Sequence, residues 1–397
     1  MSAIFKIAKR ELRYIATTKS RIGLLFVIPL VVFILLNVIY VKELVRDIPL
    51  AVLDEDHTEL TRAITRSIDS TPTVKVLYRV SSIEEVKNLI FEGKVQGAFY
   101  YPKGMTSKIK KGGSGKVGVY INSTNIIYSN LLLKESSKVI ITIASAVLLK
   151  EFESQMMTPE KAMTLVQPIK VHARSMFNPN YSYLQYLTPG LMTVLFQMII
   201  MFAATGAINR EFHNGTTDKM FETAGGKVFP VFGGKLLAYV AASLFTIVLI
   251  IGVIFPMFDI KLYGNVFYLF AFFVWFSFVS AALGLMLSSI FVDPVLALDI
   301  AFFYNSPAFV FSGFTFPVWA MPAFHQFYAA IIPYTYFLTG FLQIYQMNVP
   351  ITDVLPSIIS LGIFFAVGSA VTLVALKLRI KNSTEKKAAL SAGTVND

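Results

Sequence analysis

Six long apolar blocks set the pattern of hydrophobic and polar positions along this chain. Each block is about 20 residues long, which is the length that an α-helix needs to cross a bilayer, and polar stretches separate them. The first block lacks a small-residue cleavage pattern and exceeds the apolar core of a signal peptide, so it is predicted to be a true span. The sequence therefore predicts an α-helical membrane protein with spans at 22–41, 189–208, 236–257, 265–291, 295–311 and 354–376.

The long polar stretch 42–187, after the first span, has the pattern of a water-soluble α/β domain. Runs rich in β-branched and aromatic residues alternate with helix-like runs. Asp56 is a predicted helix N-cap, and Ser82 followed by Glu85 has the spacing of a capping box. The predicted strands lie at 48–53, 73–79, 97–101 and 116–121, the helices at 56–68 and 82–91, and a long helical stretch at 126 to about 166.

The segment 312–347, between the last two spans, fits neither a straight span nor a solvated loop. It is rich in aromatic residues, and Pro317, Pro322 and Pro333 interrupt it. Broken backbone at membrane depth must be covered by protein or must line a cavity. We therefore predict a re-entrant hairpin that closes one side of a pathway.

The basic residues predict the orientation in the membrane. The net charge is +11, six basic residues lie among the first 21, and 313–348 contains no Lys or Arg. By the positive-inside rule both termini are cytoplasmic, together with loop 209–235 and tail 377–397. The α/β domain and the re-entrant segment are then extracytoplasmic. This placement accounts for the positive charge without a nucleic-acid partner.

Residues 1–21 have an amphipathic pattern. Ile4, Ile7, Ala8, Leu12 and Ile15 share one helical face, and basic residues lie between them. A helix of this kind is predicted to lie in the membrane interface. A solvated basic tail is the alternative interpretation.

No constellation of catalytic or metal-binding residues appears in the sequence. The chain has no cysteine, and its four histidines fall in four different regions. The glycine-rich stretch 110–117 lacks a glycine and a Ser or Thr that a phosphate-binding loop requires, so we predict a surface loop. Residues 54–57 could bind a cation, although a capped turn explains them more simply. We expect no catalytic residue, metal site or cofactor in this chain, and ATP hydrolysis would need another chain.

Three polar residues inside the predicted spans are candidates for a pathway, namely Gln197, Asp299 and Asn305. Polar groups at membrane depth are costly and usually face the bundle interior or a wet cavity. Asp299 could bind a cation or a polar group of a substrate. Structural pairing, or contact with water at the membrane edge, is equally compatible with its position.

The polar segment 209–224 is predicted to be cytoplasmic. Thr216 or Thr217 can cap a short helix that carries Met220 and Phe221 among charged residues. This pattern suits a small helix that docks in the groove of a partner. An ordinary connecting loop is the alternative.

These motifs resemble the membrane subunit of an ABC-2 type exporter, of the subgroup with a large external domain after the first span. Residues 210–223 resemble the coupling segment of that family, with Glu211, Gly215 and Thr216 at its most characteristic positions. The Pro189-Gly190 pair, after 177–179, is similar to the start of the second span in that family. Residues 312–317, 321–322 and 332–336 are similar to its external re-entrant element.

The coupling segment departs from the family pattern at three positions. Phe212 and His213 stand where a second basic and acidic residue are usual, and Gly225 stands in place of a proline. These differences leave the identity of the cognate ATPase open.

The resemblance implies a permease subunit in the inner (cytoplasmic) membrane that exports an amphiphilic drug or lipid-like cargo. It implies a second permease copy, identical or paralogous, and two cytosolic ATPases that bind ATP and Mg, with a periplasmic adaptor as a further expected partner. The implied coupling residues are Arg210, Glu211, Gly215, Thr216, Met220, Phe221, Glu222 and Thr223. The resemblance also implies an external gate formed by Phe311, Phe314, Phe316 and Pro317, which joins the polar candidates Gln197, Asp299 and Asn305 as the predicted pathway.

Two other functions compete with this interpretation. A related permease could export sodium or another cation, although ion passage usually needs more ligating oxygens than these apolar spans offer. A sensor or scaffold could instead bind ligands with the α/β domain, without ATP. A secondary transporter is disfavoured because the two halves lack paired broken helices.

Overall fold

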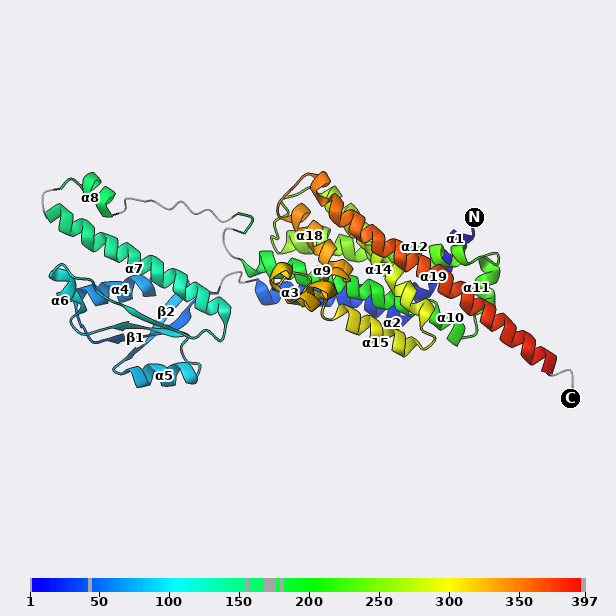
Figure 1. The fold of residues 1–397 in the computed structure, drawn as a ribbon, viewed down its shortest axis with the longest axis horizontal. Helices are drawn as coiled ribbons and strands as arrows, with labels where there is room; N and C mark the ends of the chain where they lie inside the picture. The colour runs from blue at the N-terminus through cyan, green and yellow to red at the C-terminus, as the bar shows by residue number, and fades with distance from the viewer. Residues whose placement is uncertain (1, 42–44, 155–156, 167–175, 179–181, 394–397) are drawn as a thin grey trace. The chain divides into compact units, whose positions relative to one another are not determined.

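The computed structural model describes residues 2–41, 45–154, 157–166, 176–178 and 182–393, and the side chains of all of these except 127 and 383–393. It contains two compact units (Figure 1). The membrane unit comprises 1–43 and 177–397, and the inserted unit comprises 44–176. Pro179, His172 and the last four residues of the predicted tail lie outside the described residues.

The inserted unit has an α/β fold around a four-stranded sheet of order β2-β1-β3-β4. Strands β1, β2 and β3 are parallel, and β4 pairs antiparallel with β3. The predicted strands and helices of this region are therefore present. They are β1 (Ile48–Asp54), α4 (Glu59–Asp69), β2 (Val74–Val80), α5 (Ile83–Phe91), β3 (Gly97–Tyr101), α6 (Met105–Lys110), β4 (Gly118–Ile121), α7 (Ile126–Ser154) and α8 (Pro159–Val166).

The central strand β1 is buried on both faces, because successive side chains of a strand point to opposite sides of the sheet. Leu50 and Val52 join the core on one side, which also contains Ile64 of α4 and Leu132 of α7. Ala51 and Leu53 join a smaller core on the other side, which also contains Val86 of α5. The sheet is thus covered by helices on both faces, as a parallel sheet requires.

The predicted N-cap of α4 was wrong by two residues. Thr58 caps this helix by accepting from the Thr61 N–H, within a reciprocal capping box. Asp56 instead accepts hydrogen bonds from the N–H and the hydroxyl of Thr106, at 3.0 and 2.5 Å. Ser82 caps α5 by accepting from the Glu85 N–H, but the Glu85 carboxylate accepts from the Ser81 N–H, so half of the predicted capping box is present.

The described part of the membrane unit has six helices long and apolar enough to cross a membrane, or seven if the bent pair α17 (Ala323–Ala330) and α18 (Pro333–Tyr345) counts as one span, which is consistent with the six predicted spans. The second, third and sixth spans extend beyond their predicted bounds, whereas the others differ from the prediction by up to three residues. The spans are Lys19–Tyr40, Tyr183–His213, Val228–Met257, Val266–Ile290, Pro294–Phe311 and Ile351–Asn382.

Several spans consist of more than one element. The first contains α2 (Lys19–Ile22), the π-helical turn η1 (Gly23–Val27) and α3 (Ile28–Tyr40). The second contains α9 (Tyr183–Thr205) and α10 (Asn209–His213), and α14 (Val266–Ile290) is a single helix. The others contain α12 (Val228–Val248), η2 (Leu249–Ile254), α13 (Phe255–Met257), α15 (Pro294–Asn305), α16 (Ala308–Phe311) and α19 (Ile351–Gly393).

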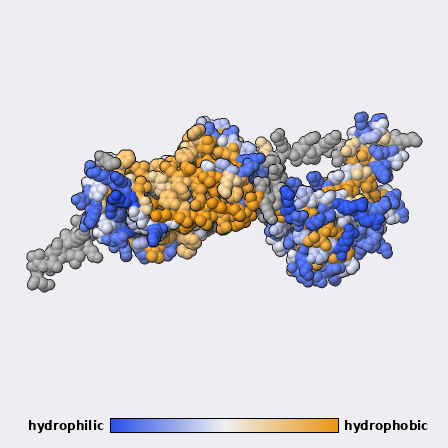
Figure 2. All heavy atoms as spheres, turned by 180° about the vertical axis from the view of Figure 1, so that it is seen from behind, coloured by the Kyte–Doolittle hydropathy of each residue, from blue (hydrophilic) through white to orange (hydrophobic). Residues whose placement is uncertain are grey.

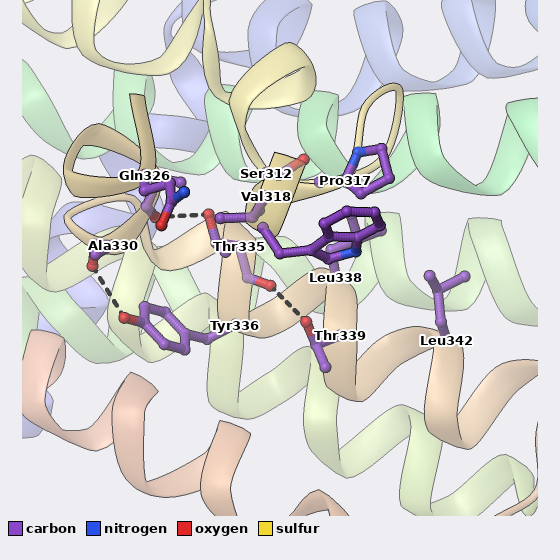
Figure 3. A pocket seen from close by; sticks show the side chains of 13 residues that line it. Ser312, Pro317, Val318, Gln326, Ala330, Thr335, Tyr336, Leu338, Thr339 and Leu342 are labelled. Atoms are coloured by element: carbon purple, nitrogen blue, oxygen red, sulfur yellow. Dashed lines mark hydrogen bonds between the residues drawn. The ribbon is translucent and has the colours of Figure 1, made fainter. Parts of the chain in front are cut away.

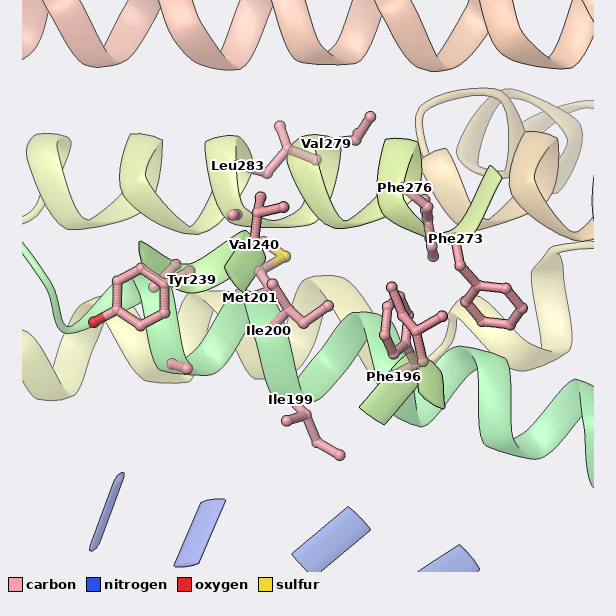
Figure 4. Close-up of a cluster of buried hydrophobic side chains, with 14 of the residues drawn as sticks. Phe196, Ile199, Ile200, Met201, Tyr239, Val240, Phe273, Phe276, Val279 and Leu283 are labelled. Atoms are coloured by element: carbon pink, nitrogen blue, oxygen red, sulfur yellow. The ribbon is translucent and has the colours of Figure 1, made fainter. Parts of the chain in front are cut away.

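Helix α9 lies at the centre of the membrane unit, since 78% of its most apolar window is buried against 17% for α19. Phe196 of α9 packs against Phe273 and Phe276 of α14 (Figure 4). Gly284 lets the two helices approach closely, because a Cβ at this position would lie 2.5 Å from the Met201 carbonyl. The outer spans form a broad hydrophobic surface (Figure 2).

The segment after α16 is broken, as predicted. Pro317 precedes η3 (Val318–Ala320), and α17 (Ala323–Ala330) meets α18 (Pro333–Tyr345) at an angle of 78°. The carbonyls freed by this break accept hydrogen bonds: Tyr304 donates to Ile331 O and Tyr336 to Ala330 O. Side chains thus replace the missing helical bonds, as apolar surroundings require.

The helix predicted near the N-terminus is present as α1 (Ala3–Thr17), but its apolar face packs on protein. A Cβ on Gly234 of α12 would lie 2.6 Å from the Ile7 Cβ, so the two helices are in close contact. Leu12 points away from this contact and is exposed. The predicted interfacial face is therefore wrong in part, because its central members are covered by α12.

Candidate coupling site and re-entrant end

Four ionised side chains from three separate helices meet in the interior at one end of the membrane unit. Glu11 of α1, Arg210 and Glu211 of α10, and Lys235 of α12 form this buried charge cluster. Lys235 is 1% exposed, and the two carboxylates are 2% and 4% exposed. Burial of a charge is tolerated only where partners surround it.

Glu11 is the best-partnered member of the buried charge cluster. Its carboxylate accepts from Lys235 Nζ at 2.6 Å and from Arg210 at 3.0 Å to each oxygen. The hydroxyl of Tyr239 donates a further bond at 2.8 Å. The Arg210 guanidinium also lies 3.5 Å from the centre of the Tyr14 ring, on the same face of α1. Glu11 thus ties α1 to both α10 and α12.

Glu211 joins the same cluster from the other side. It accepts from Arg10 at 2.7 Å, from Lys235 at 3.2 Å and from the Thr216 hydroxyl at 2.5 Å. Lys235 therefore lies between two carboxylates, while Arg10, partly exposed, supplies an additional positive charge. The network connects α1, the start of α12 and the segment 210–216 as one body.

The ionisation of Glu11 is fixed by its neighbours. Burial alone would raise the pKa of this carboxyl, but the charges of Lys235 and Arg210 outweigh it and lower the pKa from 4.5 to about 2. A carboxyl with a depressed folded-state pKa stabilises the fold above its unfolded pKa and loses that contribution as the pH falls.

We therefore expect the docking of α1 to weaken between pH 4.5 and about pH 2. Thermal unfolding of the purified protein, compared at pH 5 and pH 3, measures the effect. The Glu11→Gln variant, which cannot titrate, should show a flatter dependence over this range. An equal slope in both proteins would contradict the assignment.

Gly215 and Thr216, which were predicted as characteristic positions of the coupling segment, lie in the turn between α10 and α11 (Thr217–Thr223). Gly215 has φ +65°, a left-handed conformation that favours glycine after a helix end. The predicted cap is absent: the Thr216 side chain makes no capping bond and donates to Glu211 instead. The Thr217 hydroxyl donates to the Glu211 carbonyl. Both threonines thus fasten the turn to the buried charge cluster.

The exposed face of α11 is polar, contrary to the predicted docking of Met220 and Phe221 in a partner. Met220 is 0% exposed and belongs to the core of the membrane unit, and the half-buried Phe221 packs against that core. Lys219 and Glu222 are exposed instead. Any partner of this segment would contact polar side chains and the turn at Gly215.

Two further arginines bind the ends of central helices. Arg21 donates to the Ala203 carbonyl near the end of α9, where a Cβ on Gly206 would clash with its guanidinium. Arg379 of α19 donates to Ser288 O near the end of α14 and lies 4.3 Å from the centre of the Phe212 ring. Cations are favourable at helix C-termini, where carbonyls lack partners. Phe212, which departs from the family pattern, thus has a defined contact.

At the opposite, re-entrant end of the bundle, the Pro189-Gly190 pair contacts the broken segment. The Phe314 ring lies against Gly190, where a Cβ would come within 2.6 Å of its Cε2 atom. Tyr186 stacks on Phe314 with centroids 4.7 Å apart and donates to its carbonyl at 2.7 Å. Tyr334 donates to the Gly190 carbonyl at 2.7 Å. These bonds fix the broken segment on α9.

The other predicted gate residues are placed differently. Phe311 is half-buried and stacks on His325, whereas Phe316 is 51% exposed and Pro317 is also exposed. Gly313, at φ +92°, turns the chain so that Phe314 points inward. Among the predicted gate phenylalanines, Phe314 is the one fixed against α9.

A pocket of about 520 Å³ lies beside the broken segment (Figure 3). Val318 and Trp319 of η3 line it on one side, and Tyr336 and Thr339 of α18 on another. Trp319 is 82% exposed. The pocket is mainly apolar and suits part of an amphiphilic molecule better than a bare ion.

The three intramembrane polar residues fall into two groups. Gln197 donates to Asn305 at 2.5 Å, and both side chains are buried between α9 and α15, so they pair two helices. Asp299 is exposed on α15, on a surface with Leu296 and Phe303. The Asp299 carboxylate can therefore contact any molecule that covers this surface of α15.

Comparison with known proteins gives a match to the model of the ABC-2 family transporter protein over residues 19–374. The chain belongs to the ABC-2 transporter family. It is similar to the ABC transporter G family member 20 of Dictyostelium discoideum, with 22% identity over 56% of this chain and 29% of that protein. It is also similar to two Escherichia coli (strain K12) proteins described as probable multidrug ABC transporter permeases. YbhS is 25% identical over 55% of this chain and 56% of YbhS, and YbhR is 27% identical over 43% and 46%.

The chain thus matches between 29% and 56% of the length of these curated relatives. Membership of the ABC-2 transporter family, together with the candidate spans of the described residues, makes this chain a multi-pass membrane protein. The predicted family resemblance is confirmed.

For this ABC-2 protein, sequence analysis missed Arg10, Glu11, Lys235 and Tyr239. A signal was present for two of them. Glu11 is the one acid among the six bases of the first 21 residues, and Lys235 begins an otherwise apolar block. A charged residue beside apolar positions is rarely left buried alone, so such a residue indicates an ion pair, although it does not identify the partner.

Proposed function

We propose that this chain is the permease subunit of an ATP-driven exporter that moves an amphiphilic small molecule, drug or lipid-like cargo outward. The observation that carries the proposal is the buried charge cluster, which joins segment 210–216 to α1 and α12. A force applied to this segment would reach two helices at once, because an ion-paired interior resists deformation more than a flexible loop does.

Two cytosolic ATPases, which bind ATP and Mg, would dock on the exposed face of α10 and α11. Lys219 and Glu222 are exposed charged residues of this face, and Glu222 is one of the predicted coupling residues. Basic residues of α1 and α2, together with Lys377, Arg379 and Lys381 of α19, lie at the same end, which favours its placement in the cytoplasm. The protein would lie in the inner (cytoplasmic) membrane. The inserted unit would then lie on the extracytoplasmic side.

A second permease copy, identical or paralogous, is proposed to cover the surface of α15 that carries Asp299. A carboxylate exposed on an apolar span is unfavourable in lipid, so it is expected to face protein or a wet pathway. Leu296 and Phe303 on the same surface supply apolar contact area. The cargo would move between the two copies and leave past Phe314 at the re-entrant end.

The first test is purification of the tagged protein from its own membranes in mild detergent, with mass spectrometry of the proteins that accompany it. We expect a nucleotide-binding subunit with ATPase activity. The double reversal Lys219→Glu with Glu222→Lys should reduce its recovery about tenfold, because wrongly placed charges oppose docking. A matched double change at the re-entrant end, Lys261→Glu with Asp353→Lys, should leave recovery unchanged.

Two outcomes would count against the proposal. If no nucleotide-binding subunit accompanies the protein, even after cross-linking in intact membranes, a sensor or scaffold function becomes the better explanation. If both double variants lose the subunit equally, the docking face is elsewhere on the chain.

A further inference from the structure

The inserted unit contains an apolar groove that the proposed transport cycle does not use. It has a volume of about 550 Å³ and lies between α4, α6, the glycine-rich loop and α7. Leu60 and Ile64 line it from α4, Ile109 from α6, and Ile143 and Val147 from α7. A volume between about 300 and 1,000 Å³ is typical of a small-molecule site.

The glycine-rich loop explains why the groove stays open. Gly112 ends α6 with φ +77°, a conformation that few other residues adopt. The backbone at Gly115 lies directly on Ile109, and a Cβ here would come 2.7 Å from its Cδ1 atom. Residues 112–115 carry almost no side chain into the space between α6 and α7. One wall of the groove is therefore bare backbone.

A second pocket, of about 560 Å³, adjoins the apolar groove and shares Met105, Gly113 and Ser114 with it. Its lining contains four lysines, which are Lys103, Lys108, Lys111 and Lys116. All four are exposed, and none forms a salt bridge with a carboxylate of the described residues. Glu151 lines the apolar groove, so the two pockets together keep a net positive charge.

We propose that these two pockets form one binding site for an anionic amphiphile with a single alkyl chain. The chain would lie in the apolar groove, along the stretch of α7 from Ile140 to Phe152, which is about 18 Å long at the rise of an α-helix. The carboxylate or phosphate head would lie among the four lysines, whose ammonium groups act as flexible point charges toward an anion. The proposal does not depend on transport or on an ATPase.

The binding test uses the full chain in nanodiscs of uncharged phosphatidylcholine, with 11-(dansylamino)undecanoate as the fluorescent probe. Saturable binding of one probe per chain is expected. Ala144 is exposed and lines the groove, so Ala144→Trp should fill it and weaken binding about tenfold or more without disturbing the core. Ala146 is exposed on the same helix but outside the groove, and Ala146→Trp is the matched control.

The charge of the head is tested with Lys111→Glu combined with Lys116→Glu. This variant should bind the probe about tenfold more weakly and bind the methyl ester of the probe as the wild type does. The exposed lysines Lys87 and Lys138 lie outside both pockets, and their double reversal to Glu should change neither affinity. Equal losses for the acid and the ester would overturn the anionic part of the proposal.

Competition then distinguishes the sources of such an amphiphile. Displacement of the probe by laurate supports a free fatty acid, and displacement by lysophosphatidylglycerol supports a membrane lipid. Displacement by neither overturns the proposal. Equal affinity of the wild type and Ala144→Trp would also overturn it. The absence of saturable binding to the wild type would overturn it as well, and is the result expected if a second copy of the chain covers the groove.

Discussion

Replacing Lys235 by methionine is expected to lower the free energy of unfolding of the membrane unit by about 3–5 kcal/mol. Methionine is unbranched and one atom shorter than lysine, so the change removes the charged end with little change in the packing of the rest of the side chain. Lys235 lies 2.6 Å from Glu11 and 3.2 Å from Glu211, and all three side chains are buried. Without the ammonium group, two carboxylates remain in the interior with fewer partners. Thermal unfolding followed by circular dichroism in detergent measures the loss.

The control for Lys235→Met is Lys261→Met, because Lys261 is exposed at the re-entrant end and its loss should change stability by less than 1 kcal/mol. The double variant Glu11→Gln with Lys235→Met removes one charge of each sign. It should recover part of the lost stability, since Glu211 keeps its bonds from Arg10 and Thr216. Wild-type stability in Lys235→Met would mean that water reaches the cluster and replaces the ammonium group.

The buried charge cluster shows why sequence patterns predicted the spans but not their connections. A span is a local property, because about 20 successive apolar residues suffice to define it. Glu11 and Lys235 are separated by 224 positions, and Glu11 and Arg210 by 199. No period or spacing within one segment relates such residues, so the partners became visible only when the helices were packed.

The segment 209–224 illustrates a second limit. Its pattern predicted an amphipathic helix with Met220 and Phe221 on one side, and that helix is present. Periodicity defines an apolar face without saying what covers the face. In this protein the cover is the core of the membrane unit, and Lys219 and Glu222 are exposed. The same limit applies to α1. Its apolar face was predicted to lie in the membrane interface, but it packs on α12.

The broken segment illustrates a third limit. Three prolines predicted the interruption, because proline removes a backbone donor and ends regular helices. They could not predict which of Phe311, Phe314 and Phe316 points inward, since an irregular backbone has no period. The left-handed turn at Gly313 decides it and directs Phe314 to Gly190 of α9. A glycine in each of the two contacting segments was the available signal.

The contact between Gly190 and Phe314 leads to the second prediction. Gly190→Val places methyl groups where the Phe314 ring lies, since even a Cβ would come within 2.6 Å of Cε2. Tyr186 restricts the movement of this ring, because it stacks on the ring with centroids 4.7 Å apart and donates to the Phe314 carbonyl. We expect ATP-driven efflux of ethidium, an amphiphilic cation, from cells to fall about tenfold or more, because overpacking of about 1–3 kcal/mol displaces the broken segment.

The matched control is Gly252→Val, in a span where a Cβ would meet only the Val248 Cγ1 atom, at 3.7 Å. Both changes add the same side chain to a membrane helix, so a difference between them reports the Phe314 contact and not helix propensity. Combining Gly190→Val with Phe314→Ala should restore part of the efflux, because alanine vacates the space that valine needs. If Gly190→Val and Gly252→Val transport equally, the Phe314 ring is not a fixed part of the closed re-entrant end, and the exit of the cargo lies elsewhere in the membrane unit.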